Sequence, residues 1–107
     1  MTDKYLNEFS NRESKRNYRF FLDETINIVD GVVKRSDSQL FKIILSQLYD
    51  IKENVVKTGR LTDWTDIDDR YTIGSLAIKS FDDNDPMKDR IQTIFYGAIE
   101  YVNLPEL

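Results

Sequence analysis

Residues 62–85 read TDWTDIDDRYTIGSLAIKSFDDND, an apolar segment between two groups of aspartates. The first group is Asp63, Asp66, Asp68 and Asp69, and the second is Asp82, Asp83 and Asp85. The aromatic and aliphatic residues from Tyr71 to Phe81 lie between the two groups, which is typical of a folded element and not of a disordered acidic tail. We therefore expect this stretch to contribute to the core, with its charges at its two ends.

Two structures are compatible with the apolar part of this stretch, residues 70–81. As a helix, it places one set of residues on the core face: Ile67, Tyr71, Gly74, Ile78 and Phe81. As a strand, it needs Gly74 as a bulge or a turn, because the apolar residues change parity there. We favour a helix capped by Asp63 or Thr65, since acidic residues stabilise a helix N-terminus. A short hairpin is the alternative.

Capping signals predict two helices before this stretch. Ser10 opens a capping-box pattern, and the apolar residues that follow recur at helical spacing as far as Arg35. Ser36 opens a second capping box, and Gly59 is the expected left-handed residue that ends the second helix. Residues 1–10 are expected to fray or to form a short turn.

A last helix is predicted by Asp85 followed by Pro86, an aspartate cap with proline in the first helical position. Its apolar stripe is Met87, Ile91, Ile94, Phe95, Ala98, Ile99 and Val102. It should stop near Asn103, because Pro105 cannot continue it. Four helices with short connections predict an all-α protein, a compact antiparallel four-helix bundle that forms a single domain over residues 1–107.

The second predicted helix is apolar on two sides. Its main stripe includes Ile44, Leu48 and Ile51, whereas Leu45, Tyr49 and Val56 lie roughly opposite. A helix of this kind is normally central in its domain, or else one side is covered by a partner. The sequence thus favours a central helix and leaves open a homodimer through Leu45, Tyr49 and Val56.

Composition excludes several functions. The chain has 107 residues, 32% of them charged, and it has neither cysteine nor histidine, so disulfide and thiolate chemistry and the usual general base are absent. A calcium loop needs a central glycine and a closing glutamate, which the stretch from Asp82 to Pro86 lacks. We therefore predict a protein that is not an enzyme and that has no cofactor and no metal site.

The charge is distributed unevenly. Residues 1–60 hold eleven Lys and Arg against nine Asp and Glu, whereas residues 61–107 hold four against ten. An acidic half repels phosphate and attracts cations, so we expect a basic protein partner and no direct nucleic-acid partner. The first residues contain no apolar signal segment and no window is long enough to span a membrane, which predicts a cytoplasmic protein without membrane contact.

The candidate partner-binding residues combine carboxylates with exposed apolar side chains: Asp63, Trp64, Asp66, Asp68, Asp69, Leu76, Asp82, Asp83, Asp89 and Tyr96. Anchors surrounded by charges of one sign are typical of protein interfaces, where the anchor gives affinity and the charges steer association. The competing interpretations are that the aspartates only cap helices and that Trp64 is a lid on the core. Lys15, Arg16 and Arg19 are expected to be a solvated basic face.

These observations together predict an acidic binding protein that neutralises a basic partner. The concrete hypothesis is a bacterial immunity protein or antitoxin that covers the active surface of a cationic toxin such as a nuclease. The alternative is a homodimeric regulatory or adaptor subunit whose acidic end only keeps it soluble.

Overall fold

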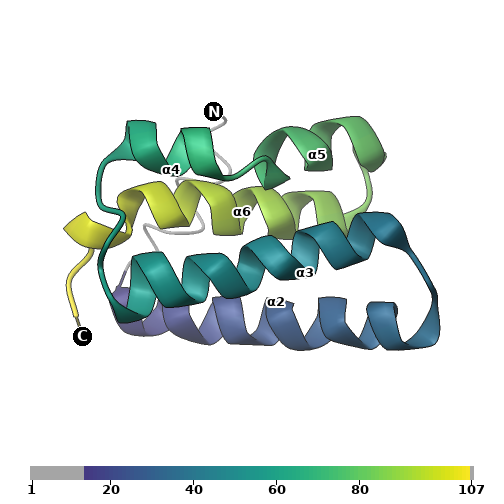
Figure 1. Cartoon of the computed structure of the whole chain (residues 1–107), viewed down its shortest axis with the longest axis horizontal. Helices are drawn as coiled ribbons and strands as arrows, with labels where there is room; N and C mark the ends of the chain where they lie inside the picture. Colours follow the sequence, from purple (N-terminus) through teal and green to yellow (C-terminus); the bar gives the residue numbers. More distant parts are fainter. Residues whose placement is uncertain (1–13, 107) are drawn as a thin grey trace.

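The computed structural model describes residues 14–106, which form α-helices and two short helical turns and contain no β-strand (Figure 1). The elements are α2 (Lys15–Arg35), α3 (Gln39–Ile51), the π-helical turn η1 (Lys52–Lys57), α4 (Trp64–Arg70), α5 (Ile73–Ser80), α6 (Pro86–Glu100) and the 3-10 turn η2 (Tyr101–Asn103). The predicted all-α bundle is confirmed. The described residues contain one α-helix more than predicted, because the third predicted helix is two.

The helices form a bundle in which α6 is the most enclosed. Figure 1 shows α2 and α3 as antiparallel neighbours, with α6 above them and with α4 and α5 placed end to end along the opposite side. Seven of the fifteen residues of α6 are buried, because the helix packs against α2, α4 and α5. The short helices α4 and α5 together run along the long direction of a molecule that measures 37 × 28 × 24 Å.

Both N-terminal boundaries differ from the prediction by a few residues. The first predicted helix, α2, begins at Lys15 and not after Ser10. Ser14 is its N-cap: the backbone of Ser14 is extended, and its side chain accepts a hydrogen bond from the Asn17 amide. The predicted capping box at Ser10 lies outside the described residues. Ser38, and not Ser36, caps α3 by accepting from the Phe41 amide. Serine is a favourable N-cap at either position, so the sequence pattern alone does not decide whether Ser36 or Ser38 caps the helix.

The two apolar sides of α3 are explained by its place in the bundle. Ile44, Leu48 and Ile51 are fully buried, while Leu45 and Val56 are half-buried and pack against the same core. Because α2 covers one side of the α3–η1 segment while Phe41 of α3 packs edge-on against Phe81 at the end of α5, one helix needs apolar residues in several directions. The segment ends as predicted: Gly59 has φ of 63°, in the left-handed region.

The stretch from Trp64 to Ser80 is neither one helix nor a hairpin. Tyr71 has an extended backbone and divides the stretch into α4 and α5. The residues that face the core in α5 are therefore counted from Ile73 and do not continue the helical spacing of α4. Ile73 and Ala77 are fully buried as a result, whereas Ile78, predicted to face the core, is 58% exposed. Gly74 lets α5 approach α6 closely, since a Cβ there would lie 2.9 Å from the Phe95 ring.

The last helix agrees with its prediction at the start and departs from it at the end. The Asp85 side chain accepts from the Met87 amide at 2.9 Å, and Pro86 is the first helical residue. After Glu100 the chain tightens into η2, which turns Tyr101 into the core and leaves Val102 45% exposed. Val102 was expected on the buried stripe, and the change from α to 3-10 geometry is the reason that it is not.

Candidate functional site

The first aspartate cluster lies on α4 and faces solvent. The Asp63 carboxylate accepts from the Thr65 amide at 2.9 Å and so begins the helix. Ile67 is fully buried and fixes which side of α4 faces the core. Helical geometry then directs Asp66, Asp68 and Asp69 away from the core, and all three are exposed. None of the three forms an ion pair with another described residue.

Trp64 stands beside this cluster as an exposed aromatic residue. Its side chain is 61% exposed, so the interpretation of Trp64 as a lid packed on the core is wrong. Trp64 and Asp68 are four residues apart in one helix, which places them on the same side of α4. A large amphipathic ring next to exposed carboxylates is a suitable anchor for a protein interface.

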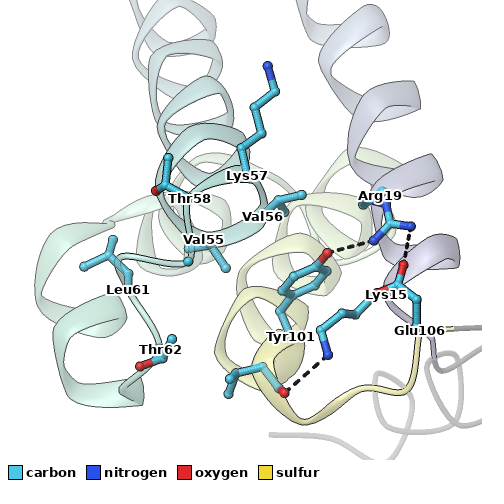
Figure 2. Close-up of a pocket in the computed structure, with 12 residues that line it drawn as sticks. Lys15, Arg19, Val55, Val56, Lys57, Thr58, Leu61, Thr62, Tyr101 and Glu106 are labelled. Atoms are coloured by element: carbon cyan, nitrogen blue, oxygen red, sulfur yellow. Dashed lines mark hydrogen bonds and ion pairs between the residues drawn. The ribbon is translucent and has the colours of Figure 1, made fainter.

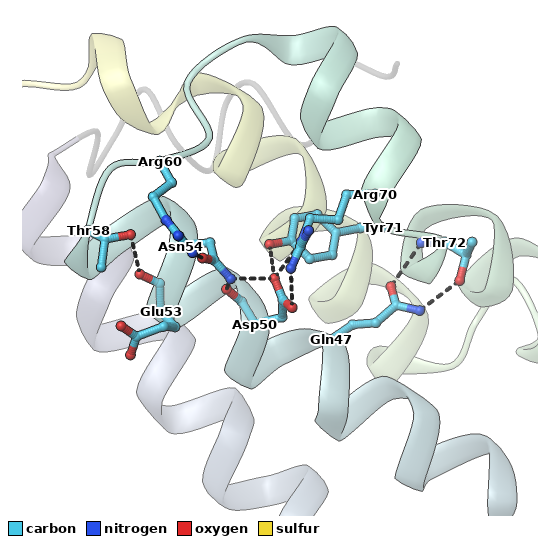
Figure 3. A network of polar contacts seen from close by, with 9 residues as sticks. All are labelled: Gln47, Asp50, Glu53, Asn54, Thr58, Arg60, Arg70, Tyr71 and Thr72. Atoms are coloured by element: carbon cyan, nitrogen blue, oxygen red, sulfur yellow. Dashed lines mark hydrogen bonds and ion pairs between the residues drawn. The ribbon is translucent and has the colours of Figure 1, made fainter.

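Asp50 of α3 holds the end of α4 in place (Figure 3). Its carboxylate accepts two hydrogen bonds from the Arg70 guanidinium, at 2.8 and 2.9 Å, and one from the Tyr71 hydroxyl at 2.6 Å. Asn54 donates a further bond at 2.9 Å. This paired geometry is the strong form of a carboxylate–guanidinium contact, and it fixes the orientation of the acidic helix.

Electrostatics at this junction follow from the same contacts. The hydrogen bonds from Arg70, Tyr71 and Asn54 hold the pKa of the Asp50 carboxyl well below its ordinary value. Burial and the neighbouring carboxylate raise the pKa of the Tyr71 hydroxyl, which therefore stays protonated and donates. The junction keeps one fixed arrangement through the neutral pH range.

Gln47 performs a similar task for α5. Its side-chain oxygen accepts from the amides of Thr72 and Ile73, at 2.8 and 3.0 Å, and its nitrogen donates to the Thr72 hydroxyl at 2.7 Å (Figure 3). A side chain of α3 thus supplies the N-terminal cap of α5, which has none of its own. The break between α4 and α5 is therefore stabilised from outside the segment.

The second aspartate cluster lies in the turn between α5 and α6, at the other end of the molecule from the start of α4 (Figure 1). Asp85 caps α6, and Asp83 forms an ion pair with Lys88. Hydrogen bonding to Lys88 lowers the pKa of the Asp83 carboxyl. The structure does not bring the two clusters together, so the predicted surface is not one patch.

The remaining predicted contact residues are less exposed than expected. Leu76 of α5 and Asp89 and Tyr96 of α6 are half-buried. The Tyr96 ring lies edge-on to the Phe95 ring, with 5.5 Å between centroids, and packs against the core. Leu76 and Tyr96 were expected to point outward, and the restart at Ile73 and this ring contact explain why neither is a free anchor.

The predicted homodimer residues divide in the same way. Leu45 and Val56 pack against the core of their own chain, and Tyr49 is 50% exposed. Tyr49 is thus the most exposed of the three seam residues, while Leu45 and Val56 are half-buried within their own chain.

The basic residues at the start of α2 form a clasp that sequence patterns did not show. The Lys15 amide donates to the Pro105 carbonyl at 2.7 Å, and the Lys15 ammonium donates to the Leu104 carbonyl at 2.5 Å. Arg19 pairs with Glu106 at 2.6 Å and donates to the Tyr101 hydroxyl at 3.0 Å (Figure 2). The prediction of a solvated basic face is wrong for Lys15 and Arg19, which bind the C-terminal segment.

Within residues 14–106, no group of three or more His, Cys, Asp or Glu side chains is arranged to hold a metal ion. Likewise, none of the described helices combines the length and the apolar character that crossing a membrane requires.

Comparison with known proteins gives one match. Residues 17–100, from α2 to the end of α6, match the model of the Tsi6 family, a type VI secretion immunity-like family. No curated protein and no solved structure matches the chain.

Proposed function

The chain belongs to the Tsi6 family, and from this premise we propose that it is an immunity protein that binds and neutralises one cognate toxin through the exposed face of α4. Family membership supports toxin immunity as the general function. The toxin's identity, its charge and the contact residues are the specific parts of the proposal.

The single observation that carries the proposed binding face is the set of exposed carboxylates beside Trp64 that pair with no residue in the described part of the chain. Asp66, Asp68 and Asp69 make no ion pair with a described residue, so their charge is available to a partner. Trp64 offers a large side chain that is 61% exposed. Interfaces gain most of their affinity from a few anchors of this kind, and charges around the anchor speed association and restrict the choice of partner.

The chemistry of this face fits a toxin with a cationic surface. The carboxylates would occupy the positions where the toxin attracts its own anionic substrate, and the bound chain would exclude that substrate. A nuclease is an example of such a toxin, because its substrate carries one phosphate per nucleotide. Inhibition by occupancy needs one immunity protein per toxin and no catalytic step.

Co-expression tests the function first. Candidate type VI toxin domains are expressed in the bacterial cytoplasm with and without this chain, and one of them should arrest growth alone and not in its presence. That domain is then the cognate toxin. Protection with both proteins confined to the cytoplasm also tests the predicted location. If the chain suppresses none of the candidate toxins and binds none in a purified mixture, toxin immunity is wrong for this chain.

Binding tests the site next. Trp64→Ala should weaken the cognate complex by about tenfold or more, since truncating a central aromatic anchor typically costs that much. Tyr49→Ala is the matched control, a similarly exposed aromatic residue on α3. The control should bind the toxin like the wild type. If Tyr49→Ala weakens the complex and Trp64→Ala does not, the toxin binds elsewhere.

A further inference from the structure

A pocket of about 340 Å³ opens where η1, η2 and the start of α2 meet (Figure 2). Its apolar lining is Val55, Val56, Leu61, Tyr101 and Val102. Val55 and Tyr101 are buried, while Val102 is 45% exposed. Beside them, a Cβ added to Gly59 would meet no atom within 4 Å, so the chain leaves this side open. The interior is apolar and accessible from solvent.

The charged residues around this pocket are mostly cationic: Lys15, Arg19, Lys57 and, as the one carboxylate, Glu106. Arg19 and Glu106 pair with each other at 2.6 Å. Lys15 donates to backbone carbonyls and to no carboxylate of the described residues. Lys57 is exposed and forms no ion pair within residues 14–106. On a chain with a net charge of −4, the described residues that border the pocket thus carry three cations against one carboxylate.

We propose that this pocket receives an apolar side chain of the cognate toxin that has an aspartate or glutamate next to it. The inference rests on the proposed function and adds a second contact to it. The apolar lining removes one side chain from water. Lys15 at the rim and Lys57, whose ammonium extends away from the lining (Figure 2), give the surroundings a positive charge that attracts the neighbouring carboxylate. A toxin side chain with no charged neighbour would gain nothing from the lysines, and one with a cationic neighbour would be repelled by them.

The position of the pocket makes the two contacts parts of one face. Leu61 and Thr62 line the pocket, and Asp63 and Trp64 follow them directly in the chain. A positive region therefore adjoins the negative surface of α4. A partner with a basic surface and one acidic, apolar protrusion would fit in one orientation only, because rotation would bring like charges together.

A second exposed apolar region, on α2, is a weaker candidate for the same role. A shallow groove on α2 is lined by Phe20 and Ile28 with Asp23 and Glu24 between them. Both carboxylates are already paired, Asp23 with Lys52 at 2.8 Å and Glu24 with Arg90 at 3.0 Å. No free charge remains there to select a partner.

Two substitutions test the pocket by different means. Lys57→Glu reverses an exposed charge, and Val102→Trp fills the mouth with a bulky ring. Affinity for the purified cognate toxin, measured by calorimetry, should fall by about tenfold in each. Lys79→Glu is the matched control, since Lys79 is also an exposed lysine in the last turn of a helix, α5. It should bind within about twofold of the wild type, and all three variants should keep the wild-type thermal midpoint.

The outcomes separate this inference from the proposed function. If Lys57→Glu and Val102→Trp bind like the wild type while Trp64→Ala binds weakly, the pocket is not a toxin contact and the α4 face remains one. If the wild type binds no toxin, the proposed function fails before the pocket is tested. If light scattering shows a dimer that either variant dissociates, a second copy occupies the pocket and the inference is wrong.

Discussion

Along α4, Asp66, Asp68 and Asp69 face solvent without a cationic partner among the described residues, whereas at the turn before α6, Asp83 pairs with Lys88 and Asp85 caps the helix. The two clusters are nearly equal in composition. The difference lies in what the surrounding chain does with the charge. Among the described residues, two of the three aspartates before α6 therefore have a local role, and only Asp82 is exposed without a capping role or an ion pair, whereas three of the four aspartates at α4 are exposed without either.

The largest effect should appear when the two clusters are neutralised separately. Replacing Asp66, Asp68 and Asp69 by asparagine should weaken the cognate complex by about 100-fold at low salt, since steering and complementary pairing are both lost. Asp82→Asn with Asp83→Asn should change affinity by less than about twofold. Surface plasmon resonance at several salt concentrations measures both. If both variants lost the same affinity for the toxin, the two clusters would contribute equally to its electrostatic attraction, and the comparison would be wrong.

The next largest effect is on stability, and it concerns Asp50, which holds the end of α4 in place. Asp50→Ala leaves Arg70 and Tyr71 without their acceptor, and we expect the free energy of unfolding in urea to fall by about 2 kcal/mol. Asp69→Asn, an exposed change on the same side of the bundle, is the control and should leave it unchanged. An Asp50→Ala chain as stable as the wild type would mean that core packing alone fixes α4.

The same carboxyl gives a pH dependence with a defined sign. Its pKa is lower in the folded than in the unfolded chain, so its stabilising effect is complete above the unfolded value of about 4 and declines as pH falls below it. The stability difference between the wild type and Asp50→Asn should thus be largest near neutral pH and shrink in acid. Urea titrations from pH 7 to pH 3 measure this difference, and a constant difference would contradict the assignment.

A smaller effect distinguishes the two capping aspartates. Asp85→Ala should lower the global free energy of unfolding by about 1 kcal/mol, because it uncaps the helix that carries much of the core. Asp63→Ala uncaps a helix of seven residues with one buried side chain, so its effect should be mostly local. Hydrogen exchange of the Thr65 and Met87 amides, followed by mass spectrometry, separates a local from a global opening.

The smallest effect is expected at Asp83. Its side chain is 97% exposed in the pair with Lys88, so Asp83→Asn should leave the urea midpoint unchanged within error. A measurable loss would mean that the second cluster has a structural role that its exposure does not suggest.

Helix boundaries that depend on local chemistry were predictable from the sequence. Gly59 and the Asp85-Pro86 pair act within one turn of the backbone, and both behave as predicted. The break between α4 and α5 was not predictable in this way. It depends on Gln47 and Asp50, which lie 20 or more residues earlier in the chain. Periodicity within the segment cannot reveal partners at that separation.

The candidate site shows the same division. The exposure of the α4 aspartates follows from the position of Ile67, and their role and that of Trp64 as partner contacts stay predictions. The prediction that Ile78 faces the core is wrong, because it assumes one continuous helix. The pocket was missed because its lining comes from η1, the loop after it, η2 and α2. No single window of sequence contains such a site.

The clasp between Lys15 and the C-terminal segment has a topological consequence. The Lys15 amide and the Pro105 carbonyl are 2.7 Å apart, so the described chain nearly closes into a ring. A short linker could join these two positions, since each residue spans more than 3 Å. New ends could then be cut in an exposed turn such as the one at Gly59, whose neighbourhood is open. The order of the helices along the polypeptide then depends only on where that ring is opened.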